Sequence, residues 1–287
     1  MIMQNLAPGR AGVANARRLV IKVGTATLTH DDGALALGRF HALVDSIVAL
    51  HRAGRQVVLV TSGAVGLGTA RLRAKPDGPD ALRRQTRAAV GQARLMALYA
   101  DAFGQMGITA AQLLVGGADL SQRERAAELR VTLGELLACG VLPIVNANDA
   151  LSLPGSAHPI TGENDRLAAH VAGHVNADLL LLLTDVDGLF DGDPRGNASP
   201  RLLGLVPVVT PAITAAAAGA GRGRGGMRTK LDAARLAARA GCMVVIANGA
   251  EAQVIERVTA GEGLGTLFPA RPRRVSAEFR PVRQQAG

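Results

Sequence analysis

From residue 18 onward, short apolar runs alternate with longer stretches in which apolar residues recur every three or four positions. The short runs are rich in Leu, Val and Ile and contain few polar residues, which is typical of strands buried on both faces of a sheet. They predict strands near 18–23, 56–60, 108–115, 142–145, 178–183 and 242–246.

The stretches between these runs have the periodicity of amphipathic helices. Within 36–53, one helical face carries Leu37, Phe40, Val44, Ile47 and Leu50. Similar patterns predict helices over 82–103, 121–138, 163–175 and 227–240. Strands that alternate with helices favour a mostly parallel sheet covered on both sides, so we predict an α/β fold, a three-layer α/β/α sandwich. Ligands of such sheets bind beyond the carboxyl ends of the strands.

One domain is the simplest organisation for a chain of 287 residues, because no internal repeat or Ser/Pro-rich linker divides it. We expect the domain to cover 17–270, with tails at 1–16 and 271–287. The stretch 215–226 consists almost wholly of Ala, Gly and Arg, which is too little apolar surface to anchor it, so we expect a mobile loop suited to a lid.

Composition narrows the function classes. Hydrophobic residues make up 48% of the chain, enough for a packed core, but aromatics make up only 2%, which disfavours base stacking and nucleic-acid binding. The net charge of +9 is spread along the chain, apart from an Arg-rich segment at 271–283, and suits a nucleotide substrate. Apolar runs such as 179–183 are too short to span a membrane, and the N-terminus lacks an apolar signal core. We therefore expect a cytoplasmic protein, with Cys139 and Cys242 reduced and buried.

Lysine is rare in this chain and its placement is informative. Only Lys22, Lys75 and Lys230 are lysines among 32 basic residues, and Lys22 and Lys230 stand beside glycines where strands and helices are expected to meet. An ammonium is a compact charge that can enter a crowded cluster of phosphate oxygens, whereas a guanidinium needs more room. Codon usage explains the scarcity but not the placement, so the pattern predicts a phosphate site built from distant segments.

Several common site motifs are absent or incomplete. Gly221, Gly223 and Gly226 satisfy G-x-G-x-x-G, but no predicted strand precedes them, and the phosphate-loop pattern is missing around Lys230. His170 and His174 share a helical face without the Glu of a zinc motif, and solvated or capping histidines are more common than ligands, so we assign them no role. We predict no metal site made by protein side chains.

Seven short motifs follow one another along the chain. In order, they are Lys22-Val23-Gly24-Thr25, Val60-Thr61-Ser62-Gly63-Ala64, Ala89-Val90-Gly91-Gln92, Asn146 with Asn148-Asp149-Ala150, Gly162-Glu163-Asn164-Asp165, Leu183-Thr184-Asp185-Val186-Asp187-Gly188-Leu189 and Gly225-Gly226-Met227-Arg228-Thr229-Lys230. Together they closely resemble the motifs of the glutamate 5-kinases, a branch of the amino acid kinase family. The resemblance covers roughly 17–270, and Gly265-Thr266-Leu267-Phe268 resembles the closing strand of that domain.

The resemblance implies transfer of the γ-phosphoryl group of ATP to the side-chain carboxylate of L-glutamate, the first step of proline synthesis. A carboxylate is already ionised at neutral pH, so such an enzyme must chiefly hold two anions together. By this resemblance Lys22 and Lys230 would neutralise the transferring group and Asp165 would orient both ammonium groups. The alternative for Asp165 is an ordinary helix-start carboxylate.

The resemblance also implies the remaining site residues and ligands. Asp149 would accept the α-ammonium of a free amino acid, which an acetylated substrate lacks. Substrate-binding positions are Ser62, Gly63, Ala64, Asn146, Asp149 and Asn164. Nucleotide-binding positions are Lys22, Gly24, Thr184, Asp185, Arg224, Gly225, Gly226, Met227, Arg228, Thr229 and Lys230, although Thr184 and Asp185 also suit an ordinary strand-end turn. Mg²⁺ would arrive with ATP. We further expect a homo-oligomer and inhibition by L-proline.

The chain departs from the family pattern at a few positions. Ala147 replaces a Glu, 158–161 replaces a Lys-containing segment, Glu163 replaces an Asp, and Arg224 replaces a Thr. Only 17 residues follow Ala270, so we expect the short form without the C-terminal RNA-modification-like domain. Three alternatives stay open: a family member with another acceptor, a weakly catalytic sensor of nucleotide or amino acid, and a nucleic-acid binder that uses the Arg-rich tail.

Overall fold

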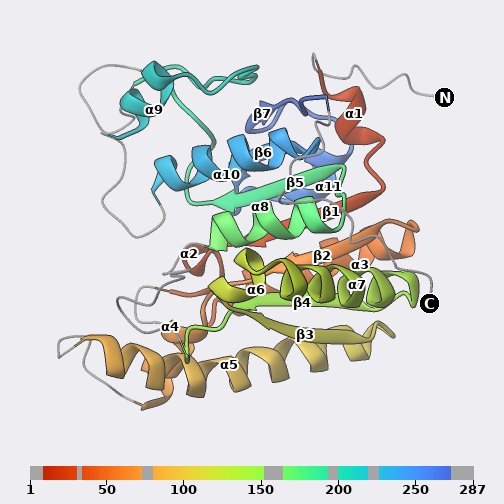
Figure 1. Ribbon diagram of the computed structural model, residues 1–287, viewed down its shortest axis with the longest axis vertical. Helices are drawn as coiled ribbons and strands as arrows, with labels where there is room; N and C mark the ends of the chain where they lie inside the picture. Colours follow the sequence, from red (N-terminus) through yellow and green to blue (C-terminus); the bar gives the residue numbers. More distant parts are fainter. Residues whose placement is uncertain are drawn as a thin grey trace.

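The computed structural model describes residues 9–30, 34–72, 80–151, 164–192, 200–218 and 226–272 (Figure 1). These residues form one seven-stranded sheet with the order β3-β4-β2-β1-β5-β6-β7. All neighbouring strands are parallel except β6 and β7. The strands are β1 Arg18–Val23, β2 Gln56–Val60, β3 Ala110–Val115, β4 Leu142–Ala147, β5 Leu179–Thr184, β6 Met243–Asn248 and β7 Thr266–Phe268.

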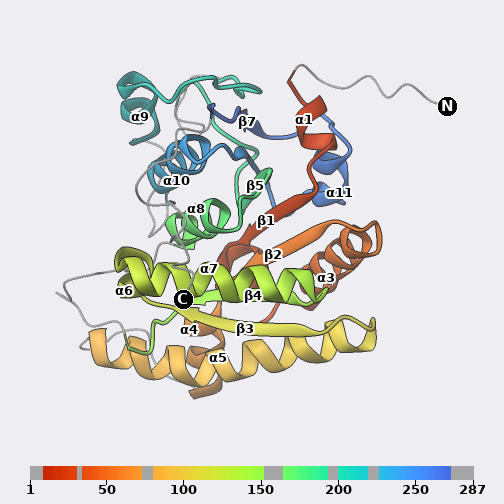
Figure 2. The ribbon, with the colours of Figure 1, turned by 45° about the vertical axis from the view of Figure 1, so that its right-hand side comes forward.

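Helices cover both faces of this sheet, as Figures 1 and 2 show. Successive strand residues point to opposite faces, so Val20 packs in a core with α7, α8 and α10, whereas Ile21 packs in a core with α3, α5 and α11. The predicted α/β/α sandwich is confirmed.

The helices are α1 Ala11–Ala14, α2 Thr25–Leu28, α3 Leu37–Arg52, α4 Ala64–Leu72, α5 Asp80–Gln105, α6 Gly117–Ser121, α7 Arg123–Ala138, α8 Asn164–His174, α9 Pro211–Ala218, α10 Met227–Arg239 and α11 Val254–Thr259.

The strand order changes direction at β1. The chain passes from β1 to β2 on one side, and β5 later pairs with the other side of β1. In parallel sheets the crevice for ligands lies at such a switch point, outside the carboxyl ends of the strands. The ends of β5, β1, β2 and β4 therefore mark the place to look for a site.

Two glycines allow α4 and α5 to cross with their backbones in contact. A Cβ atom at Gly91 would lie 1.7 Å from the carbonyl oxygen of Ala64, and one at Gly68 would lie 1.8 Å from that of Arg87. No other residue type fits at either position without moving a helix. The crossing fixes α5, which runs along the edge of the sheet beside β3 (Figure 1).

The prediction of a loop from residue 215 is wrong at its start. Helix α9 runs from Pro211 to Ala218, and the backbone N–H of Ile213 donates to the hydroxyl of Thr210 over 3.3 Å. A Thr before the helix, a Pro at its first position and an alanine run all favour helix formation, and the sequence prediction gave these features too little weight. Of the rest of the predicted loop, 219–225 lies outside the described residues, and Gly226 directly precedes α10.

The expectation that both cysteines are buried also needs correction. Cys139 is exposed, because it follows the last residue of α7 at the end of the helix, whereas Cys242 is buried as predicted. His174, to which the sequence analysis assigned no role, is buried in α8, and its burial, together with the charges of His170 and Arg130, lowers its pKa to about 4. It is therefore a neutral core residue at physiological pH.

The N-terminal segment is packed from residue 9 onward, within the expected tail of 1–16. Val13 is buried, and the guanidinium of Arg10 donates to the carbonyl oxygens of Leu264 and Gly265 over 2.8 and 3.2 Å. The domain bounds of 17–270 stay a prediction. Within the described part of the chain, no helix is both long and apolar enough to cross a membrane.

Candidate active site

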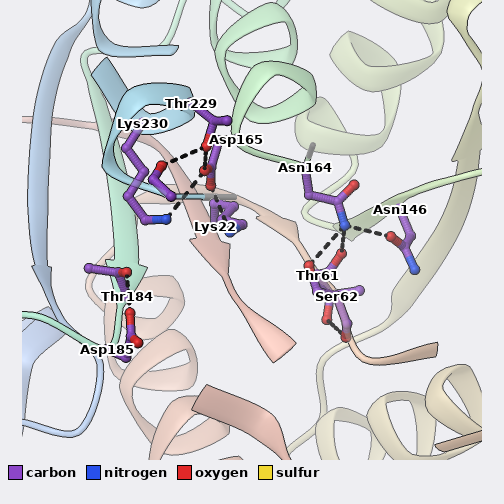
Figure 3. Close-up of polar contacts among 11 residues, drawn as sticks. Lys22, Thr61, Ser62, Asn146, Asn164, Asp165, Thr184, Asp185, Thr229 and Lys230 are labelled. Carbon is purple, nitrogen blue, oxygen red and sulfur yellow. Dashed lines mark hydrogen bonds and ion pairs between the residues drawn. The ribbon is translucent and has the colours of Figure 1, made fainter. Parts of the chain in front are cut away.

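Three groups of polar side chains lie at the carboxyl ends of the central strands (Figure 3). Their order follows the sheet, with Thr184 at the end of β5, Lys22 in β1, and Asn146 in β4 beyond β2. Helices α8 and α10 add residues from the same face of the sheet. The site therefore has a central charged group with a polar group on each side.

The central group is a carboxylate held between two ammonium groups. Lys22 Nζ lies 2.7 Å from Asp165 Oδ1, and Lys230 Nζ lies 3.5 Å from Asp165 Oδ2. The hydroxyl of Thr229 lies 2.8 Å from the same Oδ2. All three charged side chains are at least nine-tenths buried. Residues from β1, α8 and α10, far apart in sequence, thus meet at one point.

This cluster is electrostatically suited to an anion. Burial alone would raise the pKa of Asp165, but the charges of Lys22 and Lys230 and the hydrogen bonds outweigh it and hold that pKa below 3.8. Burial and the like charge of Lys22 lower the pKa of Lys230 below 10.5 despite its contact with Asp165. Asp165 is the carboxylate that contacts both ammonium groups, and the charge of Asp185 also acts on Lys230. Two ammonium groups side by side, in a site shielded from water, would attract a phosphate group.

Helix α10 begins beside this cluster. Gly226 precedes its first residue, Met227, which is buried, and Arg228 is exposed. The free backbone N–H groups of a helix start favour anions, and here they lie in the same turn as Lys230. The start of α10 thus adds donors to the two ammonium groups.

Glycines shape the backbone on both sides of the cluster. Gly24 follows β1, and a Cβ atom there would lie 3.6 Å from Lys22 Nζ, so its absence leaves space in front of the ammonium. Gly63 has a φ of +103°, a conformation that favours glycine, and ends the short connection from β2 to α4, which starts at Ala64. Gly63 and Ala64 thus put a second helix start next to the site.

The group at the end of β5 consists of Thr184 and Asp185. The hydroxyl of Thr184 donates to Asp185 Oδ1 over 3.1 Å, and the carbonyl oxygen of Thr184 accepts from the backbone N–H of Gly249 over 2.7 Å. Thr184 is buried and Asp185 is exposed. The charge of Asp185 also acts on Lys230, so this group lies on the Lys230 side of the central cluster.

The group beyond β2 is a network of amides around Asn164. Its Nδ2 lies 2.7 Å from the carbonyl oxygen of Thr61, 2.9 Å from Ser62 Oγ and 2.9 Å from Asn146 Oδ1. Asn146 Nδ2 in turn donates to Gln92 Oε1 over 2.8 Å. Because a carbonyl can only accept, Thr61 fixes the orientation of the Asn164 amide.

This network leaves two buried polar atoms without a hydrogen-bond partner among the described residues, Asn164 Oδ1 and Gln92 Nε2. One is an acceptor and the other a donor. Buried polar groups in proteins almost always have partners, so such atoms indicate a place where a polar ligand completes the bonding. A substrate with both ammonium and carboxylate groups would match this pair.

Asp149 lies two residues beyond β4 and contacts a residue that the sequence did not single out. Its Oδ2 accepts a hydrogen bond from Arg84 Nη2 of α5 over 3.2 Å. Burial raises the pKa of Asp149 above 3.8 and outweighs the opposing effect of Arg84. The position carries a carboxylate and a guanidinium side by side, three residues after Asn146 in the sequence.

Sequence reasoning missed three residues of α5. Gln92 occurred in a quoted motif without a role, whereas Arg84 is one arginine among many. The third is Tyr99, whose hydroxyl lies 3.0 Å from Thr61 Oγ1; burial raises its pKa, although the bond to Thr61 opposes this, so the hydroxyl stays protonated. A polar residue on the buried face of a predicted helix is the signal that could have identified Gln92 and Tyr99.

Other predicted positions lie outside the described residues or have lost polar character. Arg224 and Gly225 are not among the described residues, and neither are 158–161 and Glu163. Ala147 is buried in the core with α7 and α8, so this departure replaces a polar contact by apolar packing. Within the described ranges, no three His, Cys, Asp or Glu side chains cluster as metal ligands would.

Sequence comparison identifies the family of this chain. A profile of the amino acid kinase family matches residues 17–248. The chain belongs to the amino acid kinase family. It is 48% identical over 273 residues to a glutamate 5-kinase of Moorella thermoacetica, covering 94% of this chain and 71% of that protein. A glutamate 5-kinase of Symbiobacterium thermophilum is 44% identical over 263 residues, covering 90% of this chain and 98% of that protein.

Solved structures share the family fold at low sequence identity. A carbamate kinase of Giardia lamblia bound to AMP-PNP superposes with a TM-score of 0.63 at 18% identity, covering 90% of this chain and all of that one. A UMP kinase of Bacillus anthracis gives a TM-score of 0.62 at 17% identity, covering 90% of this chain and 97% of that one. These likenesses show that the fold agrees over about nine-tenths of this chain.

Proposed function

We propose that this protein phosphorylates the side-chain carboxylate of L-glutamate with ATP, giving L-glutamyl 5-phosphate and ADP. The observation that carries the proposal is the buried cluster of Lys22, Asp165 and Lys230 between two polar groups. The family and the glutamate 5-kinase relatives at 42–48% identity support the same reaction.

The reaction joins two anions, and the site supplies positive charge where they meet. An oxygen of the glutamate side-chain carboxylate attacks the γ-phosphorus of ATP, and the bond from that phosphorus to the β,γ-bridging oxygen breaks to release ADP. The carboxylate is ionised at neutral pH, so no general base is required. Lys22 and Lys230 stabilise the negative charge on the phosphoryl oxygens while the phosphoryl group moves from ATP to glutamate. Asp165 holds both ammonium groups in position.

Each of the two flanking groups binds one of the two substrates. Thr184 and Asp185 at the end of β5, with the start of α10, bind the nucleotide. Ser62, Asn146 and Asn164 bind the amino acid, whose polar groups would satisfy Asn164 Oδ1 and Gln92 Nε2. In this arrangement the acceptor carboxylate and the γ-phosphate approach Lys22 from opposite sides, which the position of β1 between β5 and β2 supports.

Asp149 provides selectivity for a free amino acid. Its carboxylate is partly buried and can accept hydrogen bonds from an α-ammonium group. An acylated amino group has no positive charge, so an N-acetylated acceptor would leave Asp149 without compensation. We therefore propose free glutamate, rather than acetylglutamate, as the acceptor.

Mg²⁺ enters with the triphosphate. Magnesium is commonly held by substrate phosphates and one or two carboxylates, and it would neutralise phosphate charge in the transition state. Asp185, exposed at the nucleotide side, is the carboxylate of this group that could approach such an ion. The homo-oligomer and inhibition by L-proline stay predictions.

A panel of acceptors tests the proposal. ADP release is measured with glutamate, aspartate, acetylglutamate, carbamate and UMP, and hydroxylamine traps any acyl phosphate as a hydroxamate. Glutamate-dependent ADP release with matching hydroxamate formation is expected. Turnover with another acceptor alone would identify a different branch of the family. Calorimetric binding of ATP and glutamate without turnover would instead support a ligand sensor.

A further inference from the structure

We propose that Arg84 binds the α-carboxylate of the acceptor amino acid, and so determines specificity together with Asp149. This inference rests on the proposed function, because it assigns a further contact to the same substrate. None of the seven sequence motifs contains Arg84.

Arg84 has donors to spare at the place where the α-carbon end of the substrate would lie. A guanidinium carries five N–H donors, and Arg84 uses Nη2 for its contact with Asp149 Oδ2, over 3.2 Å. The side chain of Arg84 is 31% exposed and that of Asp149 is 17% exposed, so the pair is accessible without being fully solvated. Its remaining donors can therefore form a charge-assisted contact with a carboxylate.

The charges of Asp149 and Arg84 are complementary to those of a zwitterionic amino acid. An amino acid carries an ammonium and a carboxylate on the same carbon, and Asp149 and Arg84 present the opposite charges on adjacent side chains. On binding, Asp149 would exchange its contact with Arg84 for one with the substrate ammonium, and Arg84 would turn to the substrate carboxylate. No buried charge is then left unpaired. An acceptor without the α-carboxylate would provide a partner for Asp149 but none for Arg84.

Helix α5 holds Arg84 in a fixed relation to the rest of the acceptor site. Arg84 precedes Gln92 by about two helical turns, or ~12 Å along the axis, and Gln92 contacts Asn146. At Gly91 the backbone of α5 lies directly against that of α4, so the two helices are closely packed at this point. One rigid helix thus carries a residue at each end of the amino-acid site.

A comparison of two acceptors separates direct binding from a supporting role. 4-Aminobutyrate retains the ammonium and the reacting carboxylate of glutamate but lacks the α-carboxylate. We expect Arg84→Gln to lower kcat/KM for glutamate by about 10- to 100-fold, mainly through KM. The KM for ATP should stay within about twofold, and kcat/KM for 4-aminobutyrate within about threefold, because that acceptor never made the lost contact.

L-Isoglutamine, in which a neutral carboxamide replaces the α-carboxylate, supplies the comparison if turnover of 4-aminobutyrate is below detection. The preference for glutamate over isoglutamine should then fall at least about tenfold in Arg84→Gln. Arg84→Lys, which keeps the charge but not the fork, should recover part of the loss. Arg94→Gln is the matched control, because Arg94 is an exposed arginine of the same helix.

Two results would overturn the inference. Equal losses for glutamate and for the acceptor without the carboxylate would show that Arg84 acts only by orienting Asp149. No loss for either would show that it has no part in binding. Failure of the proposed function is distinct, since wild-type protein would then release no ADP in response to glutamate.

Discussion

Asn164 and Asp165 are consecutive residues at the start of α8, yet their side chains enter different halves of the site. Asn164 donates to the backbone carbonyl of Thr61, just after β2, and to the side-chain amide of Asn146 in β4. Asp165 instead contacts the ammonium groups of Lys22 and Lys230. One helix start therefore links the acceptor side to the phosphoryl-transfer centre. A shift of α8 would disturb both substrates together.

Replacing either lysine by arginine should abolish most activity while leaving the fold intact. Lys22→Arg and Lys230→Arg keep the charge, but a planar fork cannot occupy the space of an ammonium 2.7 or 3.5 Å from Asp165. We expect kcat to fall by about 100-fold or more, measured as glutamate-dependent ADP release. Circular dichroism checks folding, and Arg235→Lys, on a half-exposed part of α10, is the control. Near-normal turnover in both lysine variants would argue against a shared phosphate site.

Asp165→Asn should reduce both stability and activity. The substitution leaves two buried ammonium groups without their carboxylate, which should cost about 3 kcal/mol of unfolding free energy. Because the pKa of Asp165 is lowered on folding, its contribution is present at neutral pH and is lost as the pH falls below 3.8. Urea unfolding at pH 7 measures the loss, with Asp232→Asn, whose side chain is 45% exposed, as the control. Equal stability of the two variants would contradict this.

Alkaline pH should weaken ATP binding through Lys230. Its pKa in the free protein lies below 10.5, so the ammonium loses its proton as the pH rises through that lowered value. Phosphate oxygens would favour the charged form and raise the pKa again in the complex. We expect kcat/KM for ATP to fall with rising pH, whereas kcat at saturating ATP should fall only at higher pH. If kcat/KM for ATP and kcat had the same pH dependence, ATP would not contact Lys230.

Gly91→Ala should destabilise the protein and weaken the acceptor site. Its new Cβ atom would lie 1.7 Å from the carbonyl oxygen of Ala64, so α4 and α5 would have to separate, and Gln92 would move away from Asn146. We expect a lower melting temperature and a higher KM for glutamate. Gly104→Ala, also in α5, meets nothing within 4 Å and should be neutral or slightly stabilising. Similar effects of Gly91→Ala and Gly104→Ala would show that the close crossing of α4 and α5 does not maintain the acceptor site.

The central fold could be predicted from the sequence because parallel strands buried on both faces leave a clear apolar signal. Helix α4 was missed because it is short and contains Gly66 and Gly68, which weaken any periodic pattern. Strand β7 was found only through the family resemblance, because three residues are too few for a pattern of their own.

The site could be predicted only in part. The rarity of lysine identified Lys22 and Lys230, and the resemblance added Asp165 and Asn164. Arg84 was missed because arginine is common here and only the fold brings it to Asp149. Gln92 is defined by its bond to Asn146, a contact across 54 residues that no local pattern encodes.

A crystal structure with glutamate and a non-hydrolysable ATP analogue tests the shared phosphate site most directly. If Lys22 and Lys230 act on the transferring group together, both Nζ atoms will lie within hydrogen-bonding distance of γ-phosphate oxygens, with the glutamate side-chain carboxylate facing the γ-phosphorus. A γ-phosphate bound away from either ammonium group would contradict the proposed mechanism.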